Sequence, residues 1–152
     1  MIKYAHTNIV SEDWRRLADF YIETFECEIV PPIRKQSGDW LSQGTGVSNA
    51  SLEGAHLRLP GYGEYGPTLE IYQYREIVPQ GVITANQRGF GHIAFEVDDV
   101  AQLLAKLEQN GGSREGELTV RQVPGVGEIT FIYARDPEGN LIELQSWHKD
   151  NS

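Results

Sequence analysis

Two segments of the chain place apolar side chains at helical spacing, and each begins with residues that favour a helix start. Ser11, Glu12 and Asp13 precede the first segment, and Asp98 and Asp99 precede the second. The apolar positions are Trp14, Leu17, Ala18, Tyr21 and Phe25 in the first segment, and Val100, Leu103, Leu104 and Leu107 in the second. The pattern predicts two amphipathic helices, the second of which ends at Asn110-Gly111-Gly112.

Alternating apolar and polar residues predict strands around these helices. The expected strands are residues 4–10, 27–30, 55–59, 68–74, 91–97, 119–123, 128–135 and 141–147. Pro31-Pro32 is expected to stop the second strand, and glycines make residues 33–67 a loop-rich region. Residues 75–88 are predicted to be a connector, and Asp136-Pro137-Glu138-Gly139 is typical of a type I turn.

The predicted elements repeat within the chain. At an offset of 86 residues four pairs align, namely His6 with His92, Asp13 with Asp99, Leu17 with Leu103 and Tyr21 with Leu107. At an offset of 73 residues Glu70 aligns with Glu143, and the glycine-rich stretch of the first half absorbs the difference. We therefore predict an α+β fold of two βαβββ modules, about residues 1–75 and 89–148, with a connector at about 75–88.

Composition removes several classes of protein. With 152 residues, the chain is long enough to bury a hydrophobic core. Its net charge of −9 opposes binding to nucleic acid or to an anionic membrane. Its single cysteine, Cys27, excludes an intrachain disulfide framework and a Cys-rich zinc module. No apolar run approaches about 20 residues and no secretory signal is visible, so we expect a cytoplasmic protein without a membrane segment.

Four polar residues of the repeat are expected on the sheet faces that point away from the helices. They are His6, Glu70, His92 and Glu143. Two imidazoles and two carboxylates on a polar, concave face suit a divalent first-row metal ion. A single strand histidine is more often a hydrogen-bonded core residue, and a single strand glutamate is more often solvated. Their repetition in register is what indicates a metal site.

Two segments resemble a known family. Residues 89–100 (GFGHIAFEVDDV) and 135–144 (RDPEGNLIEL) are similar to the central His strand and the closing hairpin of the vicinal oxygen chelate superfamily. That superfamily includes glyoxalase I, methylmalonyl-CoA epimerase, extradiol dioxygenases and the glyoxalase/bleomycin-resistance proteins. The resemblance covers essentially residues 1–152. It implies a single domain whose two βαβββ modules form a cupped mixed sheet around a metal site, usually in a homodimer.

The resemblance also implies a ligand set and a chemistry. The metal ligands of glyoxalase I and the epimerase match His6, Glu70, His92 and Glu143. One divalent ion (Ni, Co, Zn, Mn or Fe) is implied, with a small-molecule substrate that has a carbonyl or thioester group. A proton next to the carbonyl is removed and the enediolate is stabilised on the metal. The base is assigned to Glu143, with Glu70 as candidate second base; alternatively, both glutamates only hold the metal.

Other members of the superfamily provide alternatives. An Fe(II) extradiol-type dioxygenase would use His6, His92 and Glu143, which leaves Glu70 superfluous. A drug-binding protein of the bleomycin-resistance type has little reason to carry all four ligands. We therefore expect a lyase or isomerase of the glyoxalase I or epimerase type. A strict glyoxalase I is disfavoured by the segment Ile71-Tyr72-Gln73-Tyr74 after Glu70 and by the long glycine-rich loop.

The sequence does not define the substrate. Candidate contacts for substrate carboxylates are Arg34, Lys35, Arg58 and Arg121, although we favour surface charge as their role. The loop of residues 61–66 is a candidate pocket mouth. Four aromatic residues are candidates either for substrate packing or for the core: Trp40, Tyr72, Tyr74 and Trp147. His56 and His148 have no partner in the repeat and are treated as incidental.

Overall fold

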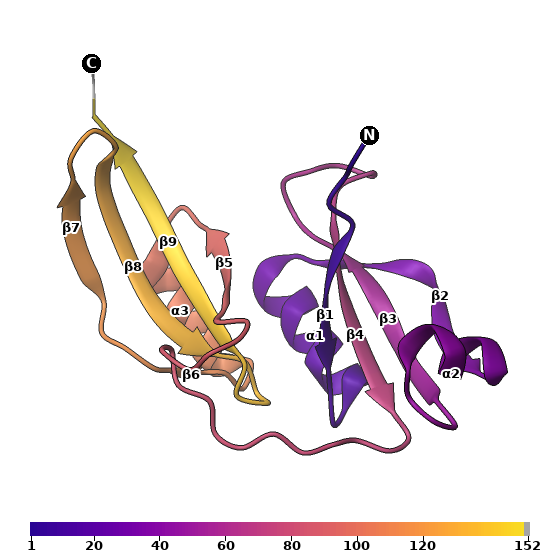
Figure 1. Ribbon diagram of the computed structural model, residues 1–152. Helices are drawn as coiled ribbons and strands as arrows, with labels where there is room; N and C mark the ends of the chain where they lie inside the picture. The colour runs from indigo at the N-terminus through magenta and orange to yellow at the C-terminus, as the bar shows by residue number, and fades with distance from the viewer. Residues whose placement is uncertain (151–152) are drawn as a thin grey trace. The chain divides into compact units, whose positions relative to one another are not determined.

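The computed structural model describes residues 1–150 and divides the chain into two compact units (Figure 1). The first unit is Met1–Pro79, and the second begins at Gln80. Each unit contains one sheet of mixed parallel and antiparallel strands and at least one helix. The predicted α+β class is therefore confirmed.

The first unit contains a four-stranded sheet with the order β1-β4-β3-β2. Its elements, in chain order, are β1 (His6–Val10), α1 (Trp14–Phe25), β2 (Glu28–Ser37), α2 (Asp39–Thr45), β3 (Ser51–Arg58) and β4 (Thr68–Tyr74). Strands β1 and β4 are parallel, whereas β4, β3 and β2 pair antiparallel. The first and last strands of the unit are therefore neighbours in the sheet.

Helix α1 covers one face of this sheet and contacts β3 and β4. Leu17 and Tyr21 on the helix are fully buried, as are Leu57 on β3 and Leu69 and Ile71 on β4. Because side chains alternate along a strand, burying Leu69 and Ile71 turns Glu70 to the opposite face. The hydrophobic core of the first unit thus determines the direction of a candidate ligand.

The second unit repeats this plan. Its elements are β5 (Ile93–Glu96), α3 (Val100–Gln109), β6 (Ser113–Arg114), β7 (Thr119–Val123), β8 (Gly127–Arg135) and β9 (Leu141–Lys149). Strand β5 is parallel to β9, β9 pairs antiparallel with β8, and both β6 and β7 pair with β8. Leu104 and Leu107 of α3 are buried, as are Ile142 and Leu144, the neighbours of Glu143.

The sequence repeat is confirmed in the register and in the helix caps. Asn8 lies opposite Glu70 in the first unit, and Ala94 lies opposite Glu143 in the second. The first-strand residues are 86 positions apart and the last-strand residues 73, which are the two offsets found in the sequence. The side chain of Asp13 accepts a hydrogen bond from the backbone N–H of Arg16 at 3.2 Å. Asp99 caps α3 in the same way.

The prediction for residues 27–67 was wrong in two respects. Strand β2 does not stop at Pro31-Pro32 but continues to Ser37, and its register with β3 shifts between Val30 and Arg34. Proline is tolerated there because β2 is an edge strand and the two prolines lie in the irregular part of the ladder. The region 33–67 also contains α2 and a longer β3 than predicted, and these elements include Gly44 and Gly54.

Residues 75–88 form neither helix nor strand, as predicted. The side chain of Arg135 holds part of this connector to the second unit by donating a hydrogen bond from Nη2 to the carbonyl oxygen of Ile83 at 2.7 Å. The same guanidinium contacts Glu115 and donates to the carbonyl oxygen of Gly139. The predicted turn at residues 136–139 is closed by a hydrogen bond from Gly139 N–H to the Asp136 carbonyl. No helix within residues 1–150 is long and apolar enough to cross a membrane.

Candidate functional site

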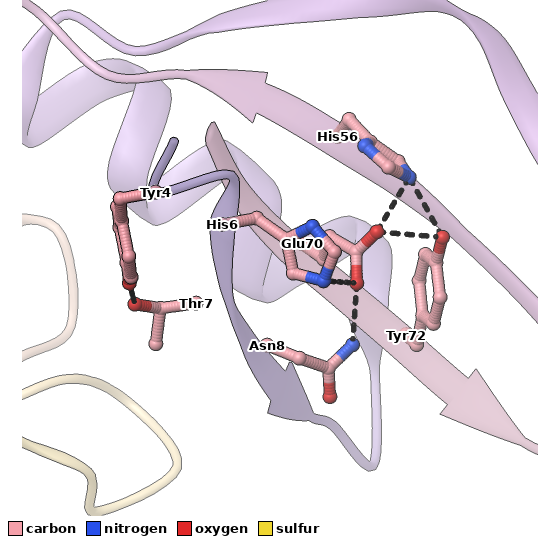
Figure 2. A network of polar contacts seen from close by, with 7 residues as sticks. All are labelled: Tyr4, His6, Thr7, Asn8, His56, Glu70 and Tyr72. Atoms are coloured by element: carbon pink, nitrogen blue, oxygen red, sulfur yellow. Dashed lines mark hydrogen bonds and ion pairs between the residues drawn. The ribbon is translucent and has the colours of Figure 1, made fainter. Parts of the chain in front are cut away.

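In the first unit, His6 and Glu70 form a contact between the parallel strands β1 and β4. Glu70 lies opposite Asn8, and His6 is two residues earlier on β1, on the same face. The Nε2 atom of His6 lies 3.0 Å from Oε1 of Glu70 (Figure 2). The Glu70 side chain is almost buried, with 9% exposed, whereas that of His6 is 43% exposed. We call His6 and Glu70 the first pair.

The second unit contains the equivalent second pair, His92 and Glu143. His92 directly precedes β5, and Glu143 on β9 lies opposite Ala94. The Nε2 atom of His92 lies 3.2 Å from Oε1 of Glu143. In both units a histidine Nε2 contacts one oxygen of a glutamate carboxylate, at nearly the same distance. The four residues that the repeat singled out therefore form one histidine–glutamate contact in each unit.

The Glu70 carboxylate has further polar neighbours (Figure 2). Asn8 donates from Nδ2 to Oε1 at 3.2 Å. On the other oxygen, Oε2, His56 Nε2 lies at 2.8 Å and the Tyr72 hydroxyl donates at 3.1 Å. His56 Nε2 and the Tyr72 hydroxyl are 2.7 Å apart, so the two donors and Oε2 form a closed triangle. Both oxygens of Glu70 are thus hydrogen-bonded within the first unit.

Treating His56 as incidental was wrong, because it lies in the site. His56 pairs with Glu70 across the antiparallel strands β3 and β4. It has no histidine partner in the repeat because the equivalent position opposite Glu143 is occupied by Tyr133. The ring of Tyr133 packs on His92, with centroids 4.6 Å apart. The register of β3 against β4 would have found His56. His148, by contrast, pairs with Glu128 and is exposed.

The electrostatic surroundings keep the two donors on Oε2 neutral near pH 7. Burial lowers the pKa of His56, and Arg34 and His6 act in the same direction against the opposing charge of Glu70. Burial and the charge of Glu70 raise the pKa of Tyr72 to about 12. The Tyr72 hydroxyl donates to Oε2 and is itself hydrogen-bonded to His56 Nε2, which lies 2.8 Å from the same oxygen. Two neutral groups therefore face one carboxylate oxygen.

The surroundings of Glu143 differ. Its Oε2 accepts a hydrogen bond from Gln145 Nε2 at 2.8 Å, and Gln145 Oε1 accepts from the indole N–H of Trp147 at 2.5 Å. At the offset of 73 residues, Gln145 takes the place of Tyr72 and Trp147 that of Tyr74. A chain of side chains along one strand therefore supports Glu143, whereas polar side chains from the three strands β1, β3 and β4 contact Glu70.

The donor atoms of each pair fit two ligands of one metal ion. Two ligand atoms bonded at about 2.1 Å and at right angles lie about 3.0 Å apart, close to the observed 3.0 Å and 3.2 Å. Within residues 1–150, no group of three or more His, Cys, Asp or Glu side chains is gathered closely enough to hold an ion. His6 and His56 lie on different oxygens of the Glu70 carboxylate, with their ring centroids 6.1 Å apart. Each unit by itself thus offers one imidazole and one carboxylate.

The candidate substrate contacts lie on the surface or in ladders of the sheets. Arg58 pairs with Glu28 at 3.1 Å, and Lys35 pairs with Glu53 at 3.6 Å, in both cases across β2 and β3. Arg34 donates to the carbonyl oxygen of Pro32, and Arg121 is exposed on β7.

The aromatic candidates divide between the site, a small core cluster and the surface. Tyr72 belongs to the site through Glu70. Tyr74 packs with Tyr72 against a cluster of Leu41, Ala50 and Leu52. Trp40 on α2 is largely exposed, as are Tyr62 and Tyr65 in the loop of residues 61–66.

Residues 3–144 match the family model described as the Glyoxalase/Bleomycin resistance protein/Dioxygenase superfamily. The chain therefore belongs to this superfamily, and the resemblance found in the sequence is confirmed.

A lactoylglutathione lyase of Escherichia coli O157:H7 is 41% identical over 56 residues, which are 36% of this chain and 38% of that protein. The chain thus matches well under half the length of this curated relative. Two solved structures share the fold. A glyoxalase family protein from Bacillus cereus has a TM-score of 0.75 at 20% identity, covering 96% of this chain and 93% of that one. The trypanothione-dependent glyoxalase I of Leishmania major has a TM-score of 0.63 at 23% identity, covering 96% and 87%.

Proposed function

We propose that the protein is a divalent-metal-dependent lyase or isomerase that removes a proton from a carbon next to a carbonyl group. The observation that carries this proposal is the repeated contact between a histidine Nε2 and a glutamate Oε1, His6 with Glu70 and His92 with Glu143. One imidazole and one carboxylate from each unit add up to a four-ligand set that suits Ni, Co, Zn, Mn or Fe. Membership of the superfamily supports the same interpretation.

The roles of the residues follow from their chemistry. His6, Glu70, His92 and Glu143 would hold the ion, which when bound supplies a Lewis acid for the carbonyl oxygen of a small-molecule substrate. Glu143 is the proposed acceptor of the proton from the adjacent carbon, as the resemblance to the superfamily implies. Glu70 holds the ion and is the candidate second base for returning the proton.

The fourth ligand favours this chemistry over oxygen activation. An Fe(II) dioxygenase needs open positions for its organic substrate and for O₂, and it uses two histidines and one carboxylate. Glu70 lies beside His6 in the same relation as Glu143 beside His92, so the first unit supplies a full pair and not an isolated histidine. A drug-binding protein without a metal would not require either pair.

We also propose a cytoplasmic homodimer, as the superfamily resemblance implies. The four ligands come from one chain or, two each, from two chains. Light scattering measures the mass in solution, and a monomer at micromolar concentration would contradict the dimer. Mixing inactive variants of His6 and His92 distinguishes the two ligand arrangements, because activity returns only if different chains complete one site.

The test of the proposed function begins with metal analysis of protein purified without chelator. About one divalent ion per four-ligand set is expected. Thiohemiacetals, acyl-CoA thioesters and catechols are then supplied as substrates in ²H₂O. Deuterium at the carbon next to the carbonyl supports the lyase or isomerase. Oxygen consumption without that exchange would indicate a dioxygenase, and binding of small molecules without metal or turnover would indicate a sequestering protein.

A further inference from the structure

The sheet face of the second unit that carries Glu143 also carries three aromatic side chains. Because residues i and i+2 of a strand share a face, Glu143 shares its face with Trp147 on β9. Tyr133 lies opposite Glu143 on β8, and Phe131 lies opposite Gln145, so both belong to the same face. The three rings are partly exposed. The alternate residues of the two strands are buried on the side of α3: Ile132, Ala134, Ile142 and Leu144. We call Phe131, Tyr133 and Trp147 the aromatic face.

The aromatic face begins at the second pair. The ring of Tyr133 packs on His92 with centroids 4.6 Å apart, and Phe131 meets Tyr133 edge-on at 6.3 Å. On β9, one amide side chain joins the indole N–H of Trp147 to Glu143. A strand rises about 3.3 Å per residue, so Phe131 lies about 7 Å and Trp147 about 13 Å along the sheet from the row of Glu143. The rings thus extend away from the proposed metal ligands.

The first unit differs at the equivalent place. Gly54 takes the position of Phe131, because it lies two residues from the residue opposite Glu70. A Cβ at Gly54 would lie 2.8 Å from Cδ1 of Tyr72, so the ring of Tyr72 covers that position. The Tyr72 hydroxyl donates to Glu70, and Arg34 lies opposite Gly54 on the next strand. The first unit therefore presents polar and charged groups beside its pair, whereas the second presents rings.

Between residues 129 and 147, the aromatic face offers no free cation to a charged part of a substrate. Arg135 is the one Lys or Arg in this range. Its guanidinium is bonded to Glu115 and to the carbonyl oxygens of Gly139 and Ile83, and its side chain is 15% exposed. A carboxylate or phosphate placed on this face would lose hydration without a compensating partner. The face therefore suits an uncharged apolar group.

We propose that the aromatic face is a subsite for an aromatic ring of the substrate, attached to the carbonyl carbon or one carbon away from it. The inference rests on the proposed function and names its substrate class, an aryl-substituted carbonyl compound. The separation follows from the position of Phe131, about 7 Å along the sheet from the row of Glu143. Aromatic rings prefer edge-on or offset contacts, as Phe131 and Tyr133 already make. A substrate ring that packs against Phe131 continues this series.

The test compares three hydroxamates on the Co²⁺-loaded protein. A hydroxamate chelates the ion through two oxygens, while the rest of the molecule is varied. Acetohydroxamate carries a methyl group, benzohydroxamate a phenyl ring, and cyclohexanecarbohydroxamate a saturated ring of similar size. The visible absorption of Co²⁺ gives the three dissociation constants. We expect benzohydroxamate to bind about 10–100-fold more tightly than acetohydroxamate, because burial of a ring is favourable. The saturated ring should fall between them, since it lacks the aromatic contact.

Two variants assign the difference to the aromatic face. Phe131→Leu keeps an apolar side chain and removes the ring. It should weaken benzohydroxamate binding about 2–10-fold and leave acetohydroxamate binding close to that of the wild type. Trp40→Leu is the matched control, because it removes a largely exposed ring from α2 of the first unit. It should change neither dissociation constant. Thermal unfolding shows whether each variant retains its folded state.

A second measurement needs no metal. Benzyl alcohol at millimolar concentration is added to the apoprotein, and the indole N–H signals are followed by NMR. The signal of Trp147 should shift, whereas that of Trp40 should not. Phe131→Leu should reduce the shift of Trp147.

Several results would overturn the inference. Equal affinities of the wild type for benzohydroxamate and acetohydroxamate would exclude an aryl subsite. An equal loss of both affinities in Phe131→Leu would indicate general damage to the site. Equal binding of the saturated and the aromatic ring would remove the preference for aryl groups. A wild-type protein that binds no Co²⁺ would overturn the proposed function, and the benzyl alcohol shift then decides separately whether the aromatic face binds a ring.

Discussion

Glu70 and Glu143 occupy the same place in two strand ladders, each on the last strand of its unit and each in contact with a histidine that begins the first strand or directly precedes it. Both are flanked by buried aliphatic residues, Leu69 and Ile71 around one and Ile142 and Leu144 around the other. The fold thus presents two carboxylates in equivalent positions, and substitutions are needed to tell their roles apart.

Replacing Glu143 by Gln should separate the base from the ligand set. The amide keeps an oxygen donor at the same length but removes the basic carboxylate. We expect the variant to retain much of its metal and to lose about 10²–10⁴ in kcat, the scale of general-base removal. Metal content and turnover are measured on the same sample, with exchange of substrate deuterium as a second signal. A fully active, metal-loaded Glu143→Gln protein would move the base to Glu70.

Replacing His6 or His92 by Ala should remove the metal together with the activity. An imidazole ligand has no substitute nearby, and each histidine supplies half of its pair. His148→Ala is the matched control, because His148 is exposed and pairs with Glu128 away from Glu143. Metal content after dialysis is the measurement. Retention of a full equivalent of metal by His92→Ala would remove His92 from the ligand set.

Gly54→Ala should destabilise the first unit and disturb the site. A Cβ at this position would lie 2.1 Å from the carbonyl oxygen of Ile71 and 2.9 Å from the Cα of Tyr72, and backbone atoms cannot yield as a flexible side chain does. We expect a loss of about 1–3 kcal/mol in the free energy of unfolding, the usual cost of overpacking. Urea unfolding and Co²⁺ titration are the measurements.

Gly44→Ala is the control for that substitution. Gly44 lies in helix α2, and an added Cβ would meet nothing within 4 Å. Alanine should stabilise the helix by about 0.5–1 kcal/mol, because glycine loses more backbone freedom on folding. Equal stability of the two variants would show that the close approach of β3 to the backbone of β4 is not a constraint.

Cys27 should be inert in the folded protein. It is 1% exposed, and burial raises the pKa of its thiol to about 12. Since the reactive species is the thiolate, only about one molecule in ten thousand would carry it at pH 8. Iodoacetamide should therefore leave the native mass unchanged and add one group after denaturation. Rapid alkylation of the native protein would contradict this burial.

The sequence could predict whatever depends on local pattern and on the repeat. Asp13 and Asp99 cap their helices as expected, and the bounds of β4 and β7 agree with the alternation of their residues. Repetition also singled out His6, Glu70, His92 and Glu143 among many polar residues, although it did not predict which of them would be in contact within a unit. These features depend on short stretches of chain or on comparison of the chain with itself.

What the sequence did not provide depends on pairing between distant strands. The passage of β2 through Pro31-Pro32 follows from its place at the edge of the sheet, which no local signal contains. The position of His56 follows from the register of β3 against β4. Comparing the two halves did not identify His56, because that comparison detects only residues of the same kind at equivalent positions in both halves.

The parallel pairing of first and last strands has a kinetic consequence. In each unit the ligand pair joins residues more than 50 positions apart, and it forms only when the final strand of that unit docks beside the first. Closing such a long loop delays the contact relative to helices and hairpins. During synthesis, neither pair can assemble until β4 or β9 has emerged from the ribosome. A chain in which β9 has not yet formed therefore lacks the His92–Glu143 contact and cannot complete the proposed four-ligand set.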